Sequence, residues 1–418
     1  MRLSGMMQKP KKKLNLKKKQ VKAENLGRVD SIIDGELYEK IAGNHINFLI
    51  GSGMSTPLYK TLALPTNVEF SFEDVLTHKS LSDNSKVILY IYYYSSIINK
   101  TTKLIEIKNI IDKDKDELDD EELVVYNYFL FVKWMAEYLA NTGVDQPKRI
   151  NLFTTNYDLL FEQTFDYSLQ NMPLLWFNDG SRGFFQKVIN SENYNINILH
   201  SGFNDNYHRE LSMINLYKLH GSVLWKYSED KEYILVDENF SLFNNLNQII
   251  NDNIQKIVLN RLETLQATSL DEYVEELNEK NIANDGGELS NDLLQNFYER
   301  YRQIPIVSPN KGKFEETVFN QYYYQFLRAF SYELEKKQTT LIVFGFSFAD
   351  EHIRSIVKRS LLNPELQVII ISFSQKSYKT MKSYFEGYNN VQFFPDFDVA
   401  MKSIRGDFDY LLKLLGAE

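Results

Sequence analysis

The stretch TTLIVFGFSFADEHIRSIVKRSLLNPELQVIIISFS, residues 339–374, decides the fold class. Two continuous apolar runs, at 339–348 and 367–374, enclose a segment at 349–362 that we interpret as a helix. Apolar strands that alternate with helices are typical of a parallel sheet covered on both faces. The stretch therefore predicts an α/β fold with a doubly wound, Rossmann-like parallel sheet, whose ligands bind at the carboxyl ends of the strands.

The same alternation extends along the chain in both directions. A helix at 316–337 precedes the stretch, and a helix at 375–388, a short strand and a last helix follow it. A short helix at 30–43 leads into the first strand, and a helix from Tyr157 follows the second. The predicted strands are 46–50, 149–156, 213–220, 339–348, 367–374 and 391–394. We find no internal repeat.

Two long segments, at about 58–148 and 226–304, are predicted to be mainly helical insertions into this core. In the first, Ser71 and Asp74 have the spacing of a helix capping box. The acidic run at 112–122 favours a helix start, because carboxylates stabilise the positive helix N-terminus. Residues 27–418 are thus predicted to form a single domain.

Composition excludes several kinds of protein. The chain has 418 residues, of which 43% are hydrophobic and 25% charged, as in an ordinary globular protein. It contains no cysteine, which excludes disulfides, thiolate catalysis and cysteine-based zinc sites. No apolar run is long enough to cross a bilayer, and the first residues lack the apolar core of a signal peptide. We therefore expect a cytoplasmic protein without membrane contact.

Charge is divided unevenly along the chain. Residues 1–22 carry +9, from eight Lys and Arg2, whereas the whole chain carries −9 and the remainder therefore −18. Such a basic run is too charged to pack and predicts a disordered tail at 1–26. The tail could contact nucleic acid, an acidic partner or the acidic body of its own oligomer, or it could simply be a solvated tail. The acidic body disfavours DNA binding, so nucleic acid contact is expected only through the tail or a partner.

Four polar segments directly follow predicted strands and form the candidate site. They are GSGMS at 51–55, TTNYD at 154–158, LHGS at 219–222 and GFSFAD at 345–350. The carboxyl ends of strands in a doubly wound sheet share one edge, so the segments are expected to converge on one crevice. Gly51 and Gly53 permit close approach of the backbone to a pyrophosphate, although Thr56 occupies the third glycine position of the dinucleotide fingerprint.

Each segment also has an ordinary structural explanation. The glycines suit a tight turn, and Thr155 or Asn156 suits a cap for the helix at Tyr157. Asp350 suits a helix N-cap in the same way. His220, at a strand end before a glycine, suits a hydrogen-bonded structural residue, but also a general base near neutral pH. The gathering of all four segments at strand ends favours a shared site.

The four segments resemble, in order and spacing, the sequence blocks of the sirtuin-like superfamily. GSGMS, TTNYD, KLHGS and GFSFAD are similar to the sirtuin blocks Gly-Ala-Gly-x-Ser, Thr-Gln-Asn-Ile-Asp, Leu-His-Gly and Gly-Thr-Ser. The resemblance covers roughly residues 30–57, 146–226 and 304–418 and implies a sirtuin-type core. Three features depart from the sirtuin deacetylases. The chain lacks their four-cysteine zinc module, and LPTNV at 64–68 replaces their Ile-Pro-Asp-Phe-Arg segment. Ser372 or a neighbour replaces the Asn that binds the adenosine ribose in sirtuins.

These departures disfavour acyl-lysine chemistry and fit a resemblance to bacterial sirtuin-like proteins of anti-phage defence. The chain looks most like the stand-alone subunit that pairs with a HerA-type ATPase. The resemblance implies an NAD⁺ hydrolase that releases nicotinamide and ADP-ribose and depletes cellular NAD⁺ in abortive infection. It further implies a homo-oligomer gated by assembly with the ATPase, with NAD⁺ as substrate, no other cofactor and no zinc.

The resemblance also implies roles for individual residues. Asn156 would orient the attacking water and the nicotinamide ribose, His220 would accept a proton, and Asp158 would position that network. The nucleotide-binding residues would be Gly51, Ser52, Gly53, Ser55, Thr155, Gly345, Ser347 and Ser372. The first four would hold the pyrophosphate, and Gly345 and Ser347 would contact phosphate or ribose. We predict that the two helical insertions form the oligomer and partner surfaces.

Three other functions stay open at this point. The same scaffold could carry an NAD-dependent protein deacylase or ADP-ribosyltransferase. An NAD(P)-dependent dehydrogenase is favoured only by the spacing Tyr378-x-x-x-Lys382, which arises easily by chance in a chain with 27 Tyr. An NAD-binding scaffold subunit of a DNA-processing ATPase complex would use the crevice without turnover.

Overall fold

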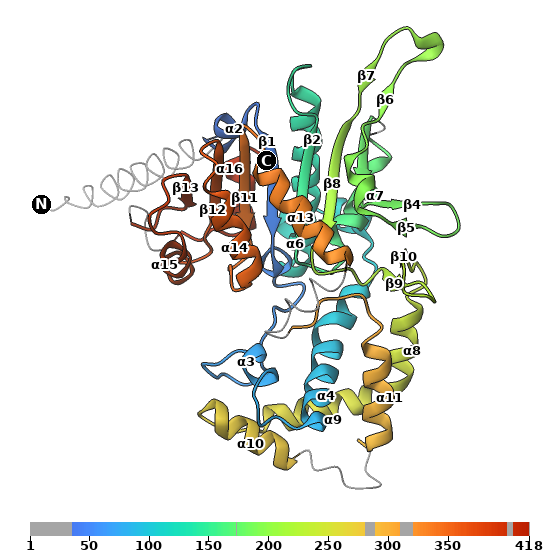
Figure 1. Ribbon diagram of the computed structural model, residues 1–418, viewed down its shortest axis with the longest axis vertical. Coiled ribbons are helices and arrows are strands. Elements are labelled where there is room, and N and C mark those ends of the chain that lie inside the picture. The colour runs from blue at the N-terminus through green and yellow to red at the C-terminus, as the bar shows by residue number, and fades with distance from the viewer. Residues whose placement is uncertain (1–35, 173, 281–288, 310–320, 399–403, 418) are drawn as a thin grey trace, which may run out of the picture.

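The computed structural model describes residues 36–172, 174–280, 289–309, 321–398 and 404–417 (Figure 1). The basic tail predicted at 1–26 lies outside the described residues. In the part of the chain that is described, no helix has both the length and the apolar character needed to cross a bilayer.

A seven-stranded parallel sheet forms the centre of the molecule, with the strand order β13-β12-β11-β1-β2-β8-β3. The strands are β1 (His45–Ile50), β2 (Arg149–Thr154), β3 (Leu175–Asn178), β8 (Ser212–Lys218), β11 (Thr339–Phe344), β12 (Leu366–Ile371) and β13 (Val391–Phe394). Every neighbouring pair is parallel. The prediction of a doubly wound α/β fold is therefore confirmed, and β3 is an edge strand that the prediction lacked.

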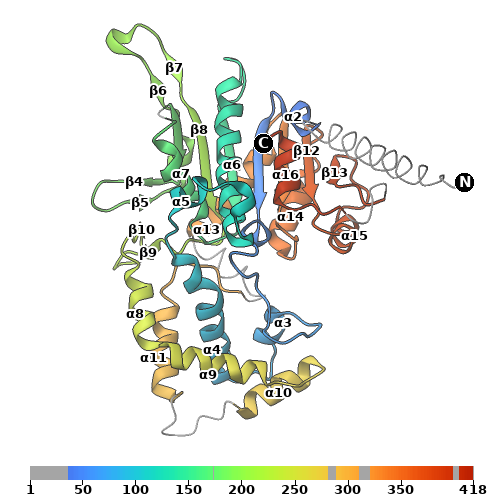
Figure 2. The ribbon, with the colours of Figure 1, turned by 180° about the vertical axis from the view of Figure 1, so that it is seen from behind.

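Helices cover both faces of this sheet (Figures 1 and 2). On one face lie α2 (Glu36–Ile41), α5 (Ile107–Ile111), α6 (Asp120–Asn141), α7 (Leu160–Leu169) and α16 (Phe408–Leu415). On the other lie α13 (Gln321–Leu334), α14 (Glu351–Ser360) and α15 (Gln375–Tyr384). Successive strand residues point to opposite faces, so Phe48 packs in the first layer and Leu49 in the second.

The predicted first insertion divides between two places. Its second half, α5 and α6, belongs to the core, because Phe131 of α6 packs edge-on against Phe48 of β1 at 5.0 Å between ring centroids. The acidic run does open this helix, where Asp119 and Glu122 form a capping box. This half of the predicted insertion therefore packs on the sheet, since the aromatic face of α6 covers it.

The rest of the insertions forms a helical lobe beyond the carboxyl ends of the strands (Figures 1 and 2). It contains α3 (Phe72–Leu76), α4 (Asp83–Tyr93), α8 (Ser241–Ile249), α9 (Asp252–Glu263), α10 (Leu270–Lys280) and α11 (Asn291–Tyr301). These helices share one hydrophobic cluster, distinct from those of the sheet. The predicted capping box of Ser71 and Asp74 starts α3.

Short strands extend the molecule on the β8 side. A four-stranded sheet has the order β4-β5-β10-β9, and β6 pairs with β7 in a separate hairpin. Their bounds are β4 (Ser181–Arg182), β5 (Val188–Ile189), β6 (Leu199–His200), β7 (Arg209–Glu210), β9 (Trp225–Tyr227) and β10 (Ile234–Val236). The start of the predicted second insertion is thus strand rather than helix: β9 pairs with β10, and Trp225 and Ile234 are buried in the hydrophobic cluster that also contains residues of α13.

Four buried asparagines form a ladder across the sheet. Asn47, Asn151, Asn215 and Asn178 occupy matched positions on β1, β2, β8 and β3. The Asn151 amide donates to Asn47 Oδ1 at 2.9 Å, Asn215 donates to Asn151 at 2.9 Å, and Asn178 donates to Asn215 at 3.0 Å. Because a slip of one residue would break every rung, the ladder fixes the register of these four strands.

Candidate functional site

The four polar segments follow four neighbouring strands of the sheet. In spatial order, the strands are β11, β1, β2 and β8, followed by segments 345–350, 51–55, 154–158 and 219–222. Hydrogen bonds join segment 51–55 to both 154–158 and 345–350, and a close contact between His220 and Asp350 joins 219–222 to 345–350. The structure therefore brings the segments together at one edge of the sheet, as predicted.

The glycines of the first loop pack against the fourth segment. The Gly51 N–H donates to Phe344 O at 3.0 Å, and the Gly53 N–H donates to Gly345 O at 2.9 Å. A Cβ atom on Gly51 would lie 2.5 Å from Gly345 O, and one on Gly345, at φ +65°, would lie 2.4 Å from the Met54 nitrogen. The close approach that requires glycine is thus between two loops of the chain. What remains open to a ligand is the exposed edge at Ser52 and Gly53.

Asn156 lies buried beneath this loop. Its Nδ2 donates to Gly51 O at 3.1 Å and to Ser55 Oγ at 3.2 Å, which fixes the orientation of the amide. Its Oδ1 is buried and has no hydrogen-bond partner among the described residues. The helix-cap explanation for Asn156 was wrong, because α7 begins at Leu160 and the Leu160 N–H is held by Asp158 instead.

Ser55 is the centre of a buried network rather than part of an open cradle. Its hydroxyl donates to Asp158 Oδ2 at 2.8 Å and accepts from Asn156. A hydroxyl has one proton to give, so Tyr128, 2.8 Å away, must be the donor in the remaining bond. Burial, followed by the charge of Asp158, raises the pKa of Tyr128 well above 10, which keeps this phenol protonated. Ser55 and Asp158 therefore hold the Asn156 side chain in position from within the buried network.

A buried lysine supports this network from the end of β8. Lys218 donates to the backbone carbonyl of Asp158 and lies 3.0 Å from Glu162 Oε1. Burial raises the pKa of Glu162 to about 7, although Lys218 acts in the opposite direction. Tyr128, Lys218 and Glu162 were not predicted from the sequence. A lysine within the otherwise apolar strand sequence was the available signal for Lys218.

His220 is held by the fourth segment. Its Nε2 lies 3.2 Å from Asp350 Oδ2, and both side chains are largely buried. The other oxygen of Asp350 accepts the N–H groups of His352 and Ile353 at 3.0 and 3.2 Å, which caps α14. Asp350 is therefore the N-cap that the sequence suggested, and in addition the carboxylate that orients His220.

The turn after His220 is tied to the segment that leaves the helical lobe. Val307 N–H donates to His220 O at 3.0 Å, and Gly221 forms an antiparallel bridge with Ile306. Gly221 has φ +86°, and a Cβ atom there would lie 2.0 Å from Pro305 O. The position of His220 is thus coupled through backbone contacts to segment 304–308.

The other predicted nucleotide-binding residues have different degrees of access. Ser347 is exposed, and Thr155 is half-buried with its hydroxyl bonded to Ile50 O. Ser372, after β12, is fully buried, and its Oγ lacks a partner among the described residues. Gly406 closes over it, since a Cβ atom on Gly406 would lie 2.3 Å from Ser372 O. Ser372 is therefore not at the surface of the crevice.

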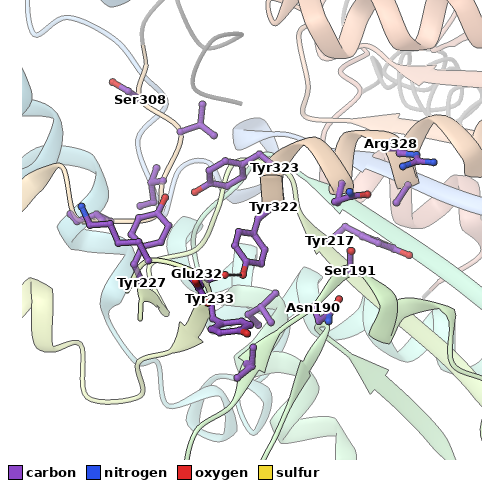
Figure 3. Close-up of a pocket in the computed structure, with 18 of the residues that line it drawn as sticks. Asn190, Ser191, Tyr217, Tyr227, Glu232, Tyr233, Ser308, Tyr322, Tyr323 and Arg328 are labelled. Atoms are coloured by element: carbon purple, nitrogen blue, oxygen red, sulfur yellow. Dashed lines mark hydrogen bonds between the residues drawn. The ribbon is translucent and has the colours of Figure 1, made fainter. Parts of the chain in front are cut away.

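A separate cavity of about 1360 Å³ lies between the helical lobe, the small sheet and α13 (Figure 3). Nine of its lining residues are tyrosines, including Tyr217, Tyr322 and Tyr323, and Tyr322 donates to the carbonyl of Glu232. None of the predicted site residues lines it. Val307 belongs to its wall, so the cavity adjoins the backbone segment that holds the His220 turn.

The dehydrogenase spacing lies away from this site. Tyr378 of α15 bonds to Asp396, Asp398 and Lys382, which are all near the β13 edge. In the sheet order, β13 is five places from β8, which at about 4.8 Å per strand corresponds to roughly 24 Å. Tyr378 and Lys382 therefore form a local cluster, and the structure does not bring them to His220.

The described residues contain no group of three or more His, Asp or Glu side chains placed to hold a metal ion. The chain matches no protein-family model and no curated protein sequence. The likeness to sirtuin-like proteins therefore rests on the four motifs.

Proposed function

We propose that the chain is an NAD⁺ glycohydrolase, which cleaves the nicotinamide–ribose bond with water to give nicotinamide, ADP-ribose and a proton. The observation that carries this proposal is the Oδ1 atom of Asn156, which is buried, unpartnered within the described chain and fixed in direction by two bonds from Nδ2. An oxygen in this state costs about 1–3 kcal/mol unless something binds it. A water molecule or a ribose hydroxyl would supply the missing donor.

The chemistry requires little from the protein beyond positioning. Nicotinamide leaves as a neutral molecule, because the electrons of the broken C–N bond neutralise its ring nitrogen. The residual ribose resembles an oxocarbenium ion, which a nearby amide oxygen and a placed water stabilise. Asn156 holds the water or ribose hydroxyl, and His220 accepts the proton that the water loses as it attacks C1′. Asp350 keeps the imidazole in place.

The same geometry supports a proposal for how the rest of the nucleotide binds. Ser52 and Gly53 present the exposed edge of the first loop and would face the pyrophosphate, with Ser347 on the neighbouring loop. Gly51 and Gly345 act by closing these loops on each other. Ser55 and Asp158 act as positioning residues for Asn156 and do not touch the substrate.

The cellular role is proposed from the motif resemblance alone. On that basis the reaction depletes cytoplasmic NAD⁺ during phage infection, and assembly with a HerA-type ATPase controls it. A gene for such an ATPase beside the gene for this chain would support this context.

Nicotinamide release from NAD⁺, measured by chromatography with and without the ATPase, tests the reaction. We expect Asn156→Ala and His220→Ala to lower turnover at least about 100-fold, as for loss of a general base or of an oriented nucleophile. Asn260→Ala and His208→Ala, at exposed positions outside the site, are matched controls and should retain turnover.

Three outcomes would contradict the proposal. Wild-type turnover in both site variants would exclude the assigned residues. Acetyl-ADP-ribose formed only with an acetylated peptide would indicate a deacylase, and label transferred to protein would indicate an ADP-ribosyltransferase. NAD⁺ binding without turnover in the presence of the ATPase would indicate a scaffold subunit.

A further inference from the structure

Exposed apolar side chains are concentrated in one short part of the chain. Among the described residues, sixteen large hydrophobic side chains are exposed, and eight of them lie within residues 169–207. These eight, which we call the edge surface, are Leu169, Leu174, Trp176, Phe184, Phe185, Leu199, Phe203 and Tyr207. By contrast, the predicted insertions at 58–148 and 226–304 contribute Leu104, Val144 and Tyr233 to the sixteen.

The most exposed side chains of the edge surface lie on the turns of two hairpins. Phe184 and Phe185 are 96% and 105% exposed, between β4 and β5, and Phe203 is 93% exposed, between β6 and β7. The first turn depends on Gly183, at φ +136°, where a Cβ atom would lie 2.0 Å from Gln186 O. In the second, the Tyr207 hydroxyl bonds to His200. Both hairpins project on the β8 side of the sheet (Figures 1 and 2).

The sheet itself is open on this side. Among the described strands, β3 is the last in the order and pairs with β8 alone. Its sequence LWFN contains no charged residue that would guard the edge, and Trp176 is 48% exposed. An unguarded strand edge beside exposed aromatic rings is a surface suited to a protein partner.

Charge distinguishes between possible partners. Residues 169–207 contain three acids and two bases, which is five charged residues among 39, or about 13%, against 25% for the whole chain. With only two bases, this part of the chain is a poor match for nucleic acid, whose binding depends on many cations. Two copies of it can approach with little repulsion, because few charges would face one another. Depletion of charge with enrichment of aromatic rings is typical of the centre of protein interfaces.

We propose that the edge surface binds a second copy of this chain in a two-fold symmetric contact. A two-fold axis places two identical strand edges side by side in opposite directions, so the same surface meets itself. The three most exposed Phe side chains, at about 150–250 Å² each, together with Trp176, approach the roughly 800 Å² per partner of a standard interface. The homo-oligomer interface is thereby assigned to the sheet edge instead of the helical insertions.

The mass of the full chain in solution tests this assignment. We expect light scattering after size exclusion to give a dimer, or a larger assembly that contains dimers, for the wild type. Phe184→Asp with Phe185→Asp, and separately Phe203→Asp, should weaken this association at least tenfold. Leu362→Asp, at an exposed apolar residue elsewhere, is the matched control and should associate like the wild type. Unchanged circular dichroism would show that the variants fold.

Tryptophan fluorescence gives a second readout. Of the three Trp residues, Trp134 and Trp225 are buried, so acrylamide quenching reports mainly on Trp176. Quenching should decrease as protein concentration rises, and this change should disappear in Trp176→Phe. A monomeric wild type at tens of micromolar, or edge variants that keep the wild-type mass, would overturn the proposal. These outcomes are independent of NAD⁺ turnover, so they leave the proposed reaction untouched.

Discussion

Asp350 serves two purposes with the two oxygens of one carboxylate. Oδ1 caps α14, and Oδ2 lies 3.2 Å from His220 Nε2. Capping the helix stabilises the fold and needs only a hydrogen-bond acceptor. Orienting the His220 imidazole depends on the negative charge of the carboxylate. A substitution that keeps the acceptor and removes the charge therefore separates the two purposes.

Asp350→Asn is that substitution. We expect nicotinamide release to fall about 10- to 100-fold, because the His220 imidazole loses the charged partner that orients it. Thermal stability should change little, since the amide oxygen can still cap the helix. Asp407→Asn makes the same change at the exposed N-cap of α16, which has no histidine partner in the described structure, and should keep full turnover. Equal turnover in the two variants would mean that Asp350 is a cap and nothing more.

At this scale the sequence predicted some site residues and not others. Asn156 and His220 could be identified because polar side chains directly after apolar strands stand out in a sequence. The burial of Ser55 could not, because a serine in a glycine loop has the same pattern whether it faces solvent or a buried carboxylate. Its role depends on Tyr128 and Asp158, which reach it from separate helical and loop segments.

At the scale of elements, the asparagine ladder explains how a sheet of mainly apolar strands obtains one register. Apolar side chains alone distinguish poorly between neighbouring registers of fully buried strands, because every position is hydrophobic. The ladder ends at Asn47, whose Nδ2 has no partner among the described residues, because its neighbour on β11 is Leu341. Loss of an interior asparagine should therefore lower the free energy of unfolding more than loss of the terminal Asn47.

Asn151→Leu tests the ladder. It leaves the buried Asn47 Oδ1 without a partner and leaves Asn215 Nδ2 with only its longer bond to Tyr194 O, at 3.4 Å. One orphaned acceptor and one further lost hydrogen bond should together lower the free energy of unfolding by about 2–4 kcal/mol. Asn47→Leu is the matched control, which disrupts one rung and places an apolar residue next to Leu341. It should cost about half as much. Urea unfolding followed by circular dichroism would measure both, and equal losses would argue against a cooperative ladder.

The elements themselves were predicted where their apolar runs were long. Strands such as β11 and β12 have six consecutive buried or largely buried residues, and such a continuous apolar run is not typical of a surface segment. β3 escaped prediction because it has four residues, one of them the exposed Trp176, and follows Pro173 closely. This short edge strand adopts its conformation because it pairs with β8, and its sequence does not indicate that pairing.

At the scale of the whole molecule, one of the contacts between the helical lobe and the loops at the strand ends involves the turn after His220. The lobe combines α4 with α8 to α11, segments separated by about 150 residues, around one hydrophobic cluster. The sequence predicted the helices but not how they associate. An amphipathic pattern indicates which face of a helix is buried, but it does not indicate which other element covers that face. The chain leaves α11 through segment 304–308, which bonds to the turn after His220 before it returns to the core.

This connection predicts that one glycine couples the lobe to the site. Gly221→Ala would place a Cβ atom 2.0 Å from Pro305 O, at a residue whose φ is +86°. The strained backbone alone costs about 1–2 kcal/mol, and the contact must also open, which moves segment 304–308 away from His220. We expect turnover to fall at least tenfold, and hydrogen exchange to rise at Val307 N–H, which is bonded to His220 O.

Gly387→Ala is the control that separates strain from contact. Gly387 has a similar φ of +89°, but a Cβ atom there would meet nothing within 4 Å. It should cost about 1–2 kcal/mol of stability and leave both turnover and exchange at Val307 unchanged. If Gly221→Ala behaves in the same way as Gly387→Ala, the bridge between segment 304–308 and the His220 turn does not set the geometry of the site. A selective loss in Gly221→Ala would instead mean that movement of the helical lobe reaches His220 through this backbone contact.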